Sequence, residues 1–469
     1  MPLIVVFVIS LIMPGIGYTS AQAQTSQTLY FMDRVPQSVF LNPAHRPGHN
    51  FYIGLPMISS LNINAKSNFA SFSDLVFKHP QYDSLISFLH PDADTGEFIS
   101  KLRDRNTIGP DLNVGILSFG FRVNSSYFSF SIAERASFSA TLPRELILLA
   151  LQGNEQFAGR TADFSNLGGE LNYYREYAAG YSLPVNDRLT AGGRAKLLFG
   201  KANFSFADKD ISLYTDPGSY NMRLRSKFTM NFSMPVTLVK NENGDIEDIN
   251  ARNDYEAGDF IFNSGNAGAA IDLGATYRLS EPLMIYASIT DLGFINWKQD
   301  VYNLSMDGDF EFAGLDLSPV FSHGDDSDPG DNLLDSLKAN FRINDTGNAY
   351  LRGLPARIYL GATYGLTPGI SLGLLSRSEI YHQNIEQAVT LSANATAGRW
   401  LSYSVSYTAM NHSYDNLGMG LSLRGGGFNF YVLSDNILST FTPHRVRNVN
   451  LWFGFNLAFG RSSDVNLPI

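Results

Sequence analysis

The chain of 469 residues contains no cysteine, and only 17% of its residues are charged. The lack of cysteine excludes a disulfide scaffold and any zinc or iron–sulfur site built on cysteine ligands. Soluble domains carry about 25% charged residues, so the charge content is low for that class. The net charge of −10 argues against nucleic-acid binding, because no basic stripe offsets repulsion by phosphate. With 44% hydrophobic and 13% aromatic residues, the composition is not that of a disordered chain.

The chain also lacks an apolar run long enough for a membrane-spanning helix, which needs about 20 residues. The apolar run at residues 3–13 is too short, and an A-x-A cleavage site ending at Ala23 follows it. We therefore interpret residues 1–23 as a secretory signal peptide and Gln24 as the first mature residue. Because Gln24 is not a cysteine, we do not expect a lipoprotein.

What the chain does have is many segments in which apolar and polar side chains alternate. From Leu401 to Ala409 every second side chain is apolar, and serine or threonine lies between them. Residues 417–424 and 449–459 alternate in a similar way. Strands of about 9–11 residues with one apolar and one polar or small face are typical of a barrel wall in lipid. The candidate strands are residues 51–65, 111–123, 127–139, 171–183, 189–206, 220–234, 269–279, 283–297, 356–366, 370–381, 387–397, 400–411, 416–425, 428–436 and 446–459, with a weaker one at 209–216.

The lengths of the connections favour a transmembrane barrel over a soluble β-sandwich. Short links such as 124–126 and 281–282 alternate with long or polar ones such as 66–110 and 298–355. Transmembrane barrels have short periplasmic turns and longer external loops. A sandwich requires neither this asymmetry nor so many aromatic residues on the apolar face. We therefore predict an all-β fold: one transmembrane antiparallel β-barrel of about 14–16 strands over residues 51–460, with short helices in the external loops and a periplasmic C-terminus.

Two stretches in the predicted external loops look helical. Residues 73–90 are mixed, whereas residues 143–152 have proline in the first turn and are then apolar nearly all round. Such a helix buries itself, touches lipid or covers a hydrophobic ligand. Packing on the barrel rim and a protein interface are the alternatives to a ligand site. The residues that would form an entry site for a lipid-like ligand are Leu146, Ile147, Leu148 and Leu149.

Basic side chains recur at the same parity on two candidate strands. Arg223, Arg225 and Lys227 share one face, and Arg194 and Lys196 belong to the preceding strand. We expect this basic face to point into the lumen, since Arg or Lys facing lipid at mid-depth costs about 2–4 kcal/mol. It would either attract anions such as a carboxylate head group or balance inward carboxylates. Charge balance is favoured because buried charges are usually paired. The carboxylates considered are Glu134, Glu170 and Asp272.

Short motifs suggest a family resemblance. The Asn42-Pro43-Ala44 triplet resembles the NPA element of long-chain fatty acid transporter-like barrels, and with Leu41 it also resembles PorP/SprF-like proteins of the type IX secretion system. Taken together, the chain is similar to an uncharacterised family of outer-membrane β-barrels from the same diderm lineages. The other segments that carry the PorP/SprF-like resemblance are Asp291-Leu292-Gly293-Phe294-Ile295 with Trp297, Ser434-Asp435-Asn436, and residues 453–460.

The resemblance implies a single barrel of about 14 strands with an N-terminal plug, which we assign to residues 24–50. Prolines at positions 36, 43 and 47 make this arm stiff and prevent an unbroken strand. Asn42, Pro43 and Ala44 are therefore plug or gating candidates, and an ordinary arm packed in the barrel mouth is the alternative. The last strand resembles the outer-membrane assembly signal, which implies the barrel-assembly machinery as a partner, although a short C-terminal tail (461–469) follows.

The sequence contains no catalytic motif of the G-x-S-x-G, H-E-x-x-H or P-loop type, and we expect no enzyme activity. The acidic segment 323–331 has calcium-binding residue types, but its spacing does not match an EF-hand, which favours a solvated loop. His412 and His444 lie in predicted loops without an identified partner. We expect no cofactor and no metal site.

These features predict an outer-membrane protein of a diderm bacterium that passively transports a small apolar or amphipathic solute. Its expected partners are outer-membrane lipid and a hydrophobic small molecule, and nucleic acid is not expected. The alternative, which follows from the PorP/SprF-like resemblance, is a structural or accessory subunit of a secretion or motility machine with secretion-system proteins as partners.

Overall fold

The computed structural model describes residues 27–460 except 80, 81, 83, 89, 91–92, 241–245, 253–257, 259–261, 313–341, 382–383, 399, 411–412 and 442–446. The predicted signal peptide, the acidic segment 323–331, His412, His444 and the C-terminal tail lie outside the described residues.

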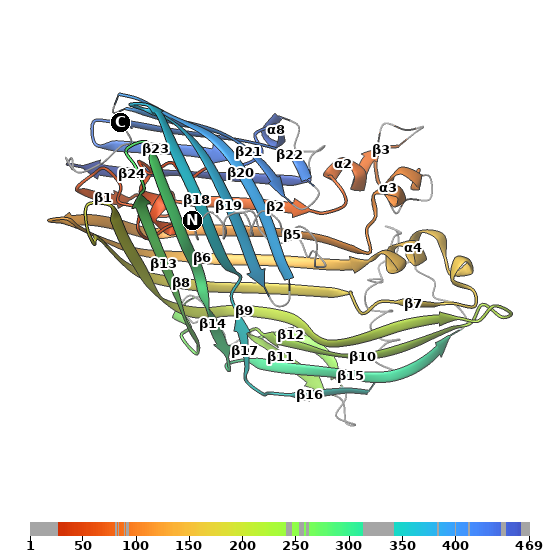
Figure 1. The fold of residues 1–469 in the computed structure, drawn as a ribbon. Helices are drawn as coiled ribbons and strands as arrows, with labels where there is room; N and C mark the ends of the chain where they lie inside the picture. Colours follow the sequence, from red (N-terminus) through yellow and green to blue (C-terminus); the bar gives the residue numbers. More distant parts are fainter. Residues whose placement is uncertain are drawn as a thin grey trace.

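Long antiparallel strands make up most of the described chain (Figure 1). Among the described residues, no helix is long and apolar enough to cross a membrane. The helices are η1 (Pro36–Phe40), α2 (Phe72–Leu75), α3 (Gly96–Lys101), α4 (Arg144–Gln152), η2 (Glu155–Phe157) and α8 (Leu438–Phe441). The strands of the wall are β1 (Phe51–Gly54), β2 (Leu61–Ser67), β5 (Arg105–Val123), β6 (Ser126–Pro143), β8 (Gly168–Pro184), β9 (Leu189–Thr215), β13 (Asn266–Arg278), β14 (Leu283–Trp297), β18 (Ala356–Thr367), β19 (Ile370–Tyr381), β20 (Asn384–Ala397), β21 (Leu401–Met410), β22 (Ser413–Gly425), β23 (Phe428–Ser434) and β24 (Asn448–Phe459). The remaining strands are β3 (Val76–Lys78), β4 (Leu85–Ser87), β7 (Thr161–Asp163), β10 (Met222–Ser233), β11 (Val236–Lys240), β12 (Ile246–Ala251), β15 (Val301–Phe312), β16 (Arg342–Thr346) and β17 (Tyr350–Gly353).

In the described part of the chain, 14 strand positions close into an antiparallel ring, which confirms the predicted fold class. The first position is shared by β1 and β2, because both pair with β24 on one side and with β5 on the other. The short turns lie at one end of the ring. Phe428, which follows one of these turns, pairs with Leu457 near the end of β24, so the C-terminal end of the wall lies there too, as predicted.

The ring has fewer strands than the sequence candidates because two of the segments do not form strands of the ring, and a third is interrupted but still fills one position. The candidate at 51–65 is broken between β1 and β2, where Pro56 offers no N–H and Met57 has a positive φ of 66°. The candidate at 209–216 is the far end of β9 rather than a separate strand. The candidate at 220–234 forms β10, which lies beyond the ring.

We call the strands beyond the ring the sheet extension. It consists of the far half of β9, from residue 203 onward, together with β7, β10, β15 and β16, each paired with its neighbour. β15 and β16 lie within the connection 298–355, which the sequence analysis treated as a loop. Their polar residues hid them, since one of them contains Asp307, Gly308 and Asp309 in a row.

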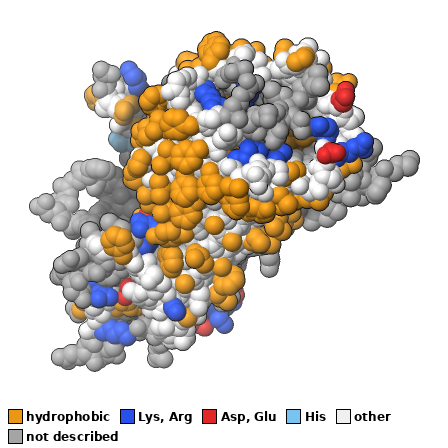
Figure 2. All heavy atoms as spheres, turned by 90° about the vertical axis from the view of Figure 1, so that its left-hand side faces the viewer, with side chains coloured by type: hydrophobic (Ala, Val, Ile, Leu, Met, Phe, Trp, Pro, Cys, Tyr) orange, Lys and Arg blue, Asp and Glu red, His pale blue; other side chains and the backbone are white. Residues whose placement is uncertain are grey.

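Side chains alternate across the wall as the sequence predicts. In β21, Tyr403 and Val405 are exposed on the outer face, whereas Ser404 and Ser406 are buried on the inner face. Figure 2 shows the apolar side chains gathered in a broad patch with few charges inside it. A closed ring has no unpaired strand edge, and its apolar outer face suits lipid. Other exposed apolar side chains of the wall are Phe121, Tyr181, Leu197, Ile271, Leu273, Leu372, Leu391 and Met419.

The two helix predictions have different outcomes. The helix predicted at 143–152 is present as α4, and Pro143 is its N-cap residue. The helix predicted at 73–90 is wrong, because α2 has only four residues and the hairpin of β3 and β4 follows it. Pro80 in the middle of that segment is incompatible with a continuous helix.

Candidate functional site: the barrel lumen and its N-terminal arm

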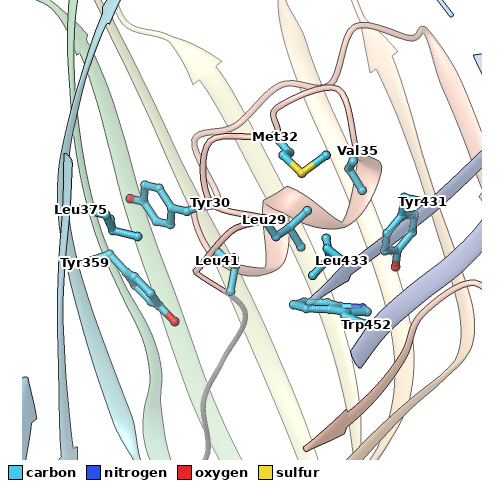
Figure 3. Packing of buried hydrophobic residues seen from close by; sticks show 10 residues of the cluster. All are labelled: Leu29, Tyr30, Met32, Val35, Leu41, Tyr359, Leu375, Tyr431, Leu433 and Trp452. Atoms are coloured by element: carbon cyan, nitrogen blue, oxygen red, sulfur yellow. The ribbon is translucent and has the colours of Figure 1, made fainter. Parts of the chain in front are cut away.

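Residues 27–50, which we call the N-terminal arm, lie inside the barrel. Most of their side chains are buried, and η1 is the arm's one regular element. Arm and wall side chains point toward one another around η1 (Figure 3). The cluster joins Leu29, Tyr30, Met32, Val35 and Leu41 of the arm to Tyr359, Leu375, Tyr431, Leu433 and Trp452 of the wall.

The arm closes the short-turn end of the barrel. Arg34 donates to the carbonyl oxygen of Gly398 at 2.9 Å, and Arg46 donates to that of Ser125 at 2.9 Å. Both carbonyls belong to short turns. The backbone N–H of Asn50 donates to the carbonyl of Phe459 at 3.1 Å, where the arm passes into β1. The arm is therefore attached to this end on several sides of the ring.

Asp435 holds the other end of the arm. Its carboxylate accepts hydrogen bonds from the backbone N–H groups of Gln27 and Thr28, both at 2.9 Å, and from the Thr28 hydroxyl at 2.6 Å. Hydrogen bonds to a charged acceptor are about twice as strong as neutral ones. Asp435 is therefore a positioning residue for the arm, a role that the sequence analysis did not assign to it.

The arm contacts the wall through a turn formed by Asn42, Pro43 and Ala44. The Asn42 side-chain oxygen accepts the backbone N–H of Ala44 at 2.9 Å, and its amide nitrogen donates to the Tyr30 hydroxyl at 3.1 Å. Ser288 of β14 donates to the carbonyl of Leu41 at 2.8 Å. These bonds fix the turn, and any gating role of the triplet stays a prediction.

Two wall glycines receive this turn. A Cβ atom on Gly192 would overlap the carbonyl of Pro43, and one on Gly274 would overlap the side-chain oxygen of Asn42. Glycine is required wherever two backbones approach this closely. The wall is thus shaped to the arm, which is an integral part of the closed barrel.

A chamber of about 110 Å³ lies between the arm and the long-loop end of the barrel. Phe40 and Leu41 of the arm border it, together with Trp452 of the wall. Most of its other lining residues are polar or charged. The charged lining residues are Arg135, Lys196, Arg357, Asp111, Glu176 and Asp291, and the amide-bearing ones are Asn62, Asn64, Asn113 and Asn172.

A network of buried ion pairs forms one wall of the chamber. The Lys196 ammonium lies 2.8 Å from Asp272 and 2.5 Å from Asp291, and Arg194 lies 3.2 Å from Asp272. Arg357 joins Asp291 at 2.6 Å to Glu379 at 2.8 Å. Arg194 and Lys196 are therefore neutralised by inward carboxylates, and Asp272 is one of the partners considered from the sequence.

The predicted single basic face is corrected by the structure. Arg223 and Arg225 lie in the sheet extension, where their side chains are 56% and 67% exposed and pair with Glu311 and Asp309 of β15. Lys227 is exposed on the same strand. The cost of facing lipid does not apply to a segment beyond the ring. These three side chains therefore do not join the buried pair on β9.

His45 lies inside the contact between arm and wall, edge-on to the rings of Tyr30 and Tyr286. Burial lowers the pKa of its imidazole from 6.5 to about 4. The stability that neutral His45 provides is thus fully present above pH 6.5 and is lost as the pH falls toward 4. At pH 5 we expect the free energy that holds the arm in place to be lower by about 2 kcal/mol than at neutral pH. The measurement is limited proteolysis, which should cleave the arm faster at pH 5.

The His45→Gln variant is the control for this acid sensitivity, because its side chain does not titrate. We expect a smaller change between the two pH values in this variant. Some response remains in both proteins, because burial also lowers the pKa of His49, to about 3. Equal acid sensitivity of the arm in the variant and the natural chain would contradict the role of His45.

The family model of DUF5723, described as a family of unknown function, matches residues 43–435. The chain belongs to this family. No curated protein matches it. The DUF5723 barrel is similar to the TodX deltaS2S3 mutant monoaromatic hydrocarbon channel, with 8% identity, a TM-score of 0.43, and coverage of 90% of this chain and 94% of that chain. It is also similar to the Ralstonia pickettii toluene transporter TbuX, with 9% identity, and to a Pseudomonas aeruginosa FadL homologue, with 8% identity. Each of these two matches has a TM-score of 0.41 and covers 90% of this chain and 93% of the other chain. Likenesses this distant indicate no cargo, and the PorP/SprF-like resemblance stays a prediction.

The apolar helix α4 of this DUF5723 barrel packs between two clusters. Ile147 is buried against Phe69 and Phe98, and Leu146 and Leu149 pack against a second cluster that includes residues of β9 and β10. Leu148 borders both clusters. Neither the chamber nor the second cavity described below is lined by α4. This packing favours the rim interpretation, and a ligand site at the helix stays a prediction.

Sequence reasoning missed several charged residues of the DUF5723 chamber. It considered Glu134 as an inward carboxylate, but Glu134 pairs with Arg175, and the neighbours of these two residues, Arg135 and Glu176, line the chamber. Successive side chains of a strand point to opposite faces, so an error of one residue reverses the assignment. One signal in the sequence could have indicated them: Arg135 on β6 and Glu176 on β8 carry opposite charges, and these two strands follow one another in the wall.

Proposed function

We propose that this DUF5723 barrel lies in the outer membrane of a diderm bacterium and passively admits a small amphipathic solute. The observation that carries the proposal is the chamber, which lies inside a closed ring and is separated from the short-turn end by a non-covalently held arm. With no cysteine in the chain, no disulfide fixes the arm to the wall. Such an arrangement suits a passage that opens when the arm or its side chains shift.

The lining of the chamber supports a solute with both polar and apolar parts. Phe40, Tyr359 and Trp452 offer ring faces, and the asparagine side chains offer hydrogen bonds. The charged lining residues are three cations and three carboxylates, which leaves no net charge to attract an anion. A zwitterion that carries an apolar group matches this combination better than a free carboxylate does.

The outer surface supports the membrane location. Apolar side chains cover the ring where it would meet lipid, and the strand edges are paired. Contact with outer-membrane lipid and insertion by the barrel-assembly machinery follow from this proposal.

The test is uptake into liposomes that contain the purified barrel. Zwitterionic amino acids with apolar side chains serve as probes, because protein-free membranes admit them slowly, and glutamate serves as the anionic comparison. We expect the barrel to speed uptake of phenylalanine and leucine more than uptake of glutamate. The proposal would be overturned if neither the natural barrel nor a barrel with an opened lumen took up any probe faster than protein-free liposomes do.

A further inference from the structure

A second cavity of about 60 Å³ lies at the short-turn end of the barrel, on the other side of the arm from the chamber. It is bordered by Phe31 and Met32 of the arm and by Tyr286 and Thr363 of the wall. Residues near the short turns, such as Gly369, also line it. The arm therefore has the chamber on its side toward the long-loop end and the second cavity on its side toward the short-turn end.

Both cavities border the same two neighbouring strands, β14 and β18. On β14 the chamber touches Asp291 and the second cavity touches Tyr286. On β18 the chamber touches Tyr359 and the second cavity touches Thr363. The nearest lining residues of the two cavities lie four residues apart on either strand, from Tyr286 to Thr290 and from Tyr359 to Thr363. At about 3.3 Å per residue, this separation is about 13 Å.

A group of aromatic rings fills the space between them. The ring of Phe31 lies 5.4 Å from that of Tyr286 and 5.2 Å from that of Tyr30, and Tyr30 stacks on Tyr359 at 5.2 Å. Tyr30 is held by its hydroxyl, which contacts Asn42 at 3.1 Å and Ser288 at 3.2 Å. Phe31 has no polar group that could hold it in the same way.

The wall offers Phe31 a smooth glycine surface. A Cβ atom on Gly373 would lie 2.7 Å from the ring of Phe31, and one on Gly361 would lie 3.0 Å from it. Without these Cβ atoms the Phe31 ring packs closely against β18 and β19 at the two glycines. Its side chain is half-buried and borders the second cavity. Phe31 is thus the ring of the group that can rotate toward open space.

We propose that the chamber and the second cavity are the two ends of one passage along β14 and β18, and that the Phe31 ring closes it against Tyr286. The proposal rests on the proposed function and specifies where its solute crosses the arm. The passage has polar ends and an aromatic middle, so it selects small zwitterions that carry an apolar group. The arm itself stays in place, because rotation of one ring is sufficient.

The first experiment compares uptake of phenylalanine into liposomes by the natural barrel, Phe31→Ala and Val39→Ala. Val39 also belongs to the arm, but it packs against Tyr52 and Tyr127 on another part of the wall. We expect Phe31→Ala to raise the uptake rate about tenfold and Val39→Ala to leave it nearly unchanged. Heat-modifiable gel mobility and proteolysis of the arm verify that both barrels are folded and that the arm is in place.

The second experiment uses the absence of natural cysteine. In Phe31→Ala/Thr363→Cys the new thiol lies in the second cavity, and a small methanethiosulfonate reagent should return uptake to the natural rate. Phe31→Ala alone should not respond to the reagent. The proposed passage would be wrong if Phe31→Ala and Val39→Ala took up phenylalanine at equal rates. It would also be wrong if modification of the cysteine had no effect on uptake.

The failure of the passage is distinguishable from the failure of transport. A Gly192→Val barrel, in which the arm is displaced, tests transport through the lumen in general. If that barrel admits phenylalanine and Phe31→Ala does not increase uptake, the passage is wrong and the proposed function stands. If neither admits it, the proposed function is wrong as well.

Discussion

Replacing Gly192 by valine is expected to open the lumen. The added side chain would occupy the position of the Pro43 carbonyl, and a backbone group cannot rotate away as a side chain does. Overpacking of this kind costs about 3 kcal/mol, enough to displace the arm from its seat in most molecules. We expect stepwise currents in planar bilayers from Gly192→Val barrels and few or none from the natural protein.

Gly193→Val is the matched control, because it adds the same side chain one residue further along β9. A Cβ atom at this position would meet its nearest neighbour, the carbonyl oxygen of Asp272, at an ordinary 3.5 Å, and no arm atom is close. This barrel should stay as closed as the natural one. If both variants conduct equally, the effect comes from damage to the wall, and the arm is not what closes the lumen.

The wall could be predicted from the sequence because its period is local. In β21 the exposure of Tyr403 and the burial of Ser404 follow from alternation alone. Alternation along one strand does not show where its neighbour carries an extra residue. Register shifts lie between Gly115 and Leu117 where β5 pairs with β6, and between Tyr173 and Tyr174 where β8 pairs with β9, whereas β6, which carries Glu134, pairs with β8 without a shift. Nothing in the local sequence announces these shifts.

The site could be predicted only in part, because its contacts join distant segments. The prolines of the arm predicted a non-helical segment that no unbroken strand crosses. No strand crosses residues 27–50, but Pro36–Phe40 form the 3-10 helix η1, so the non-helical part of the prediction is wrong. The bond between Thr28 and Asp435 spans 407 residues, and the seat of Pro43 on Gly192 depends on which wall strand the arm meets. In the sequence, a glycine on the inner face of a strand indicates only a weak strand propensity. Its role in making room for the arm is visible only in a structure that contains the arm.

Asp272→Ala is expected to destabilise the barrel strongly. The Asp272 carboxylate is fully buried and binds Arg194 at 3.2 Å and Lys196 at 2.8 Å, and it also accepts the backbone N–H of Asp291 at 2.7 Å. Removing it leaves two buried cations with fewer partners, a change that costs about 3–5 kcal/mol in proteins. We expect a value near the lower limit, because Lys196 keeps Asp291. The measurement is the shift in the urea midpoint of unfolding in lipid vesicles.

Glu311→Ala provides the comparison, since it also removes one carboxylate from an arginine. The Glu311 side chain is 56% exposed in the sheet extension, and its pair with Arg223 has a separation of 3.4 Å. Exposed pairs of this kind contribute about 0–1 kcal/mol, because water solvates the arginine that remains. The two substitutions therefore separate burial from charge. Similar midpoints for both variants would mean that water reaches Arg194 and Lys196, and the buried network would then contribute little to holding the lumen wall together.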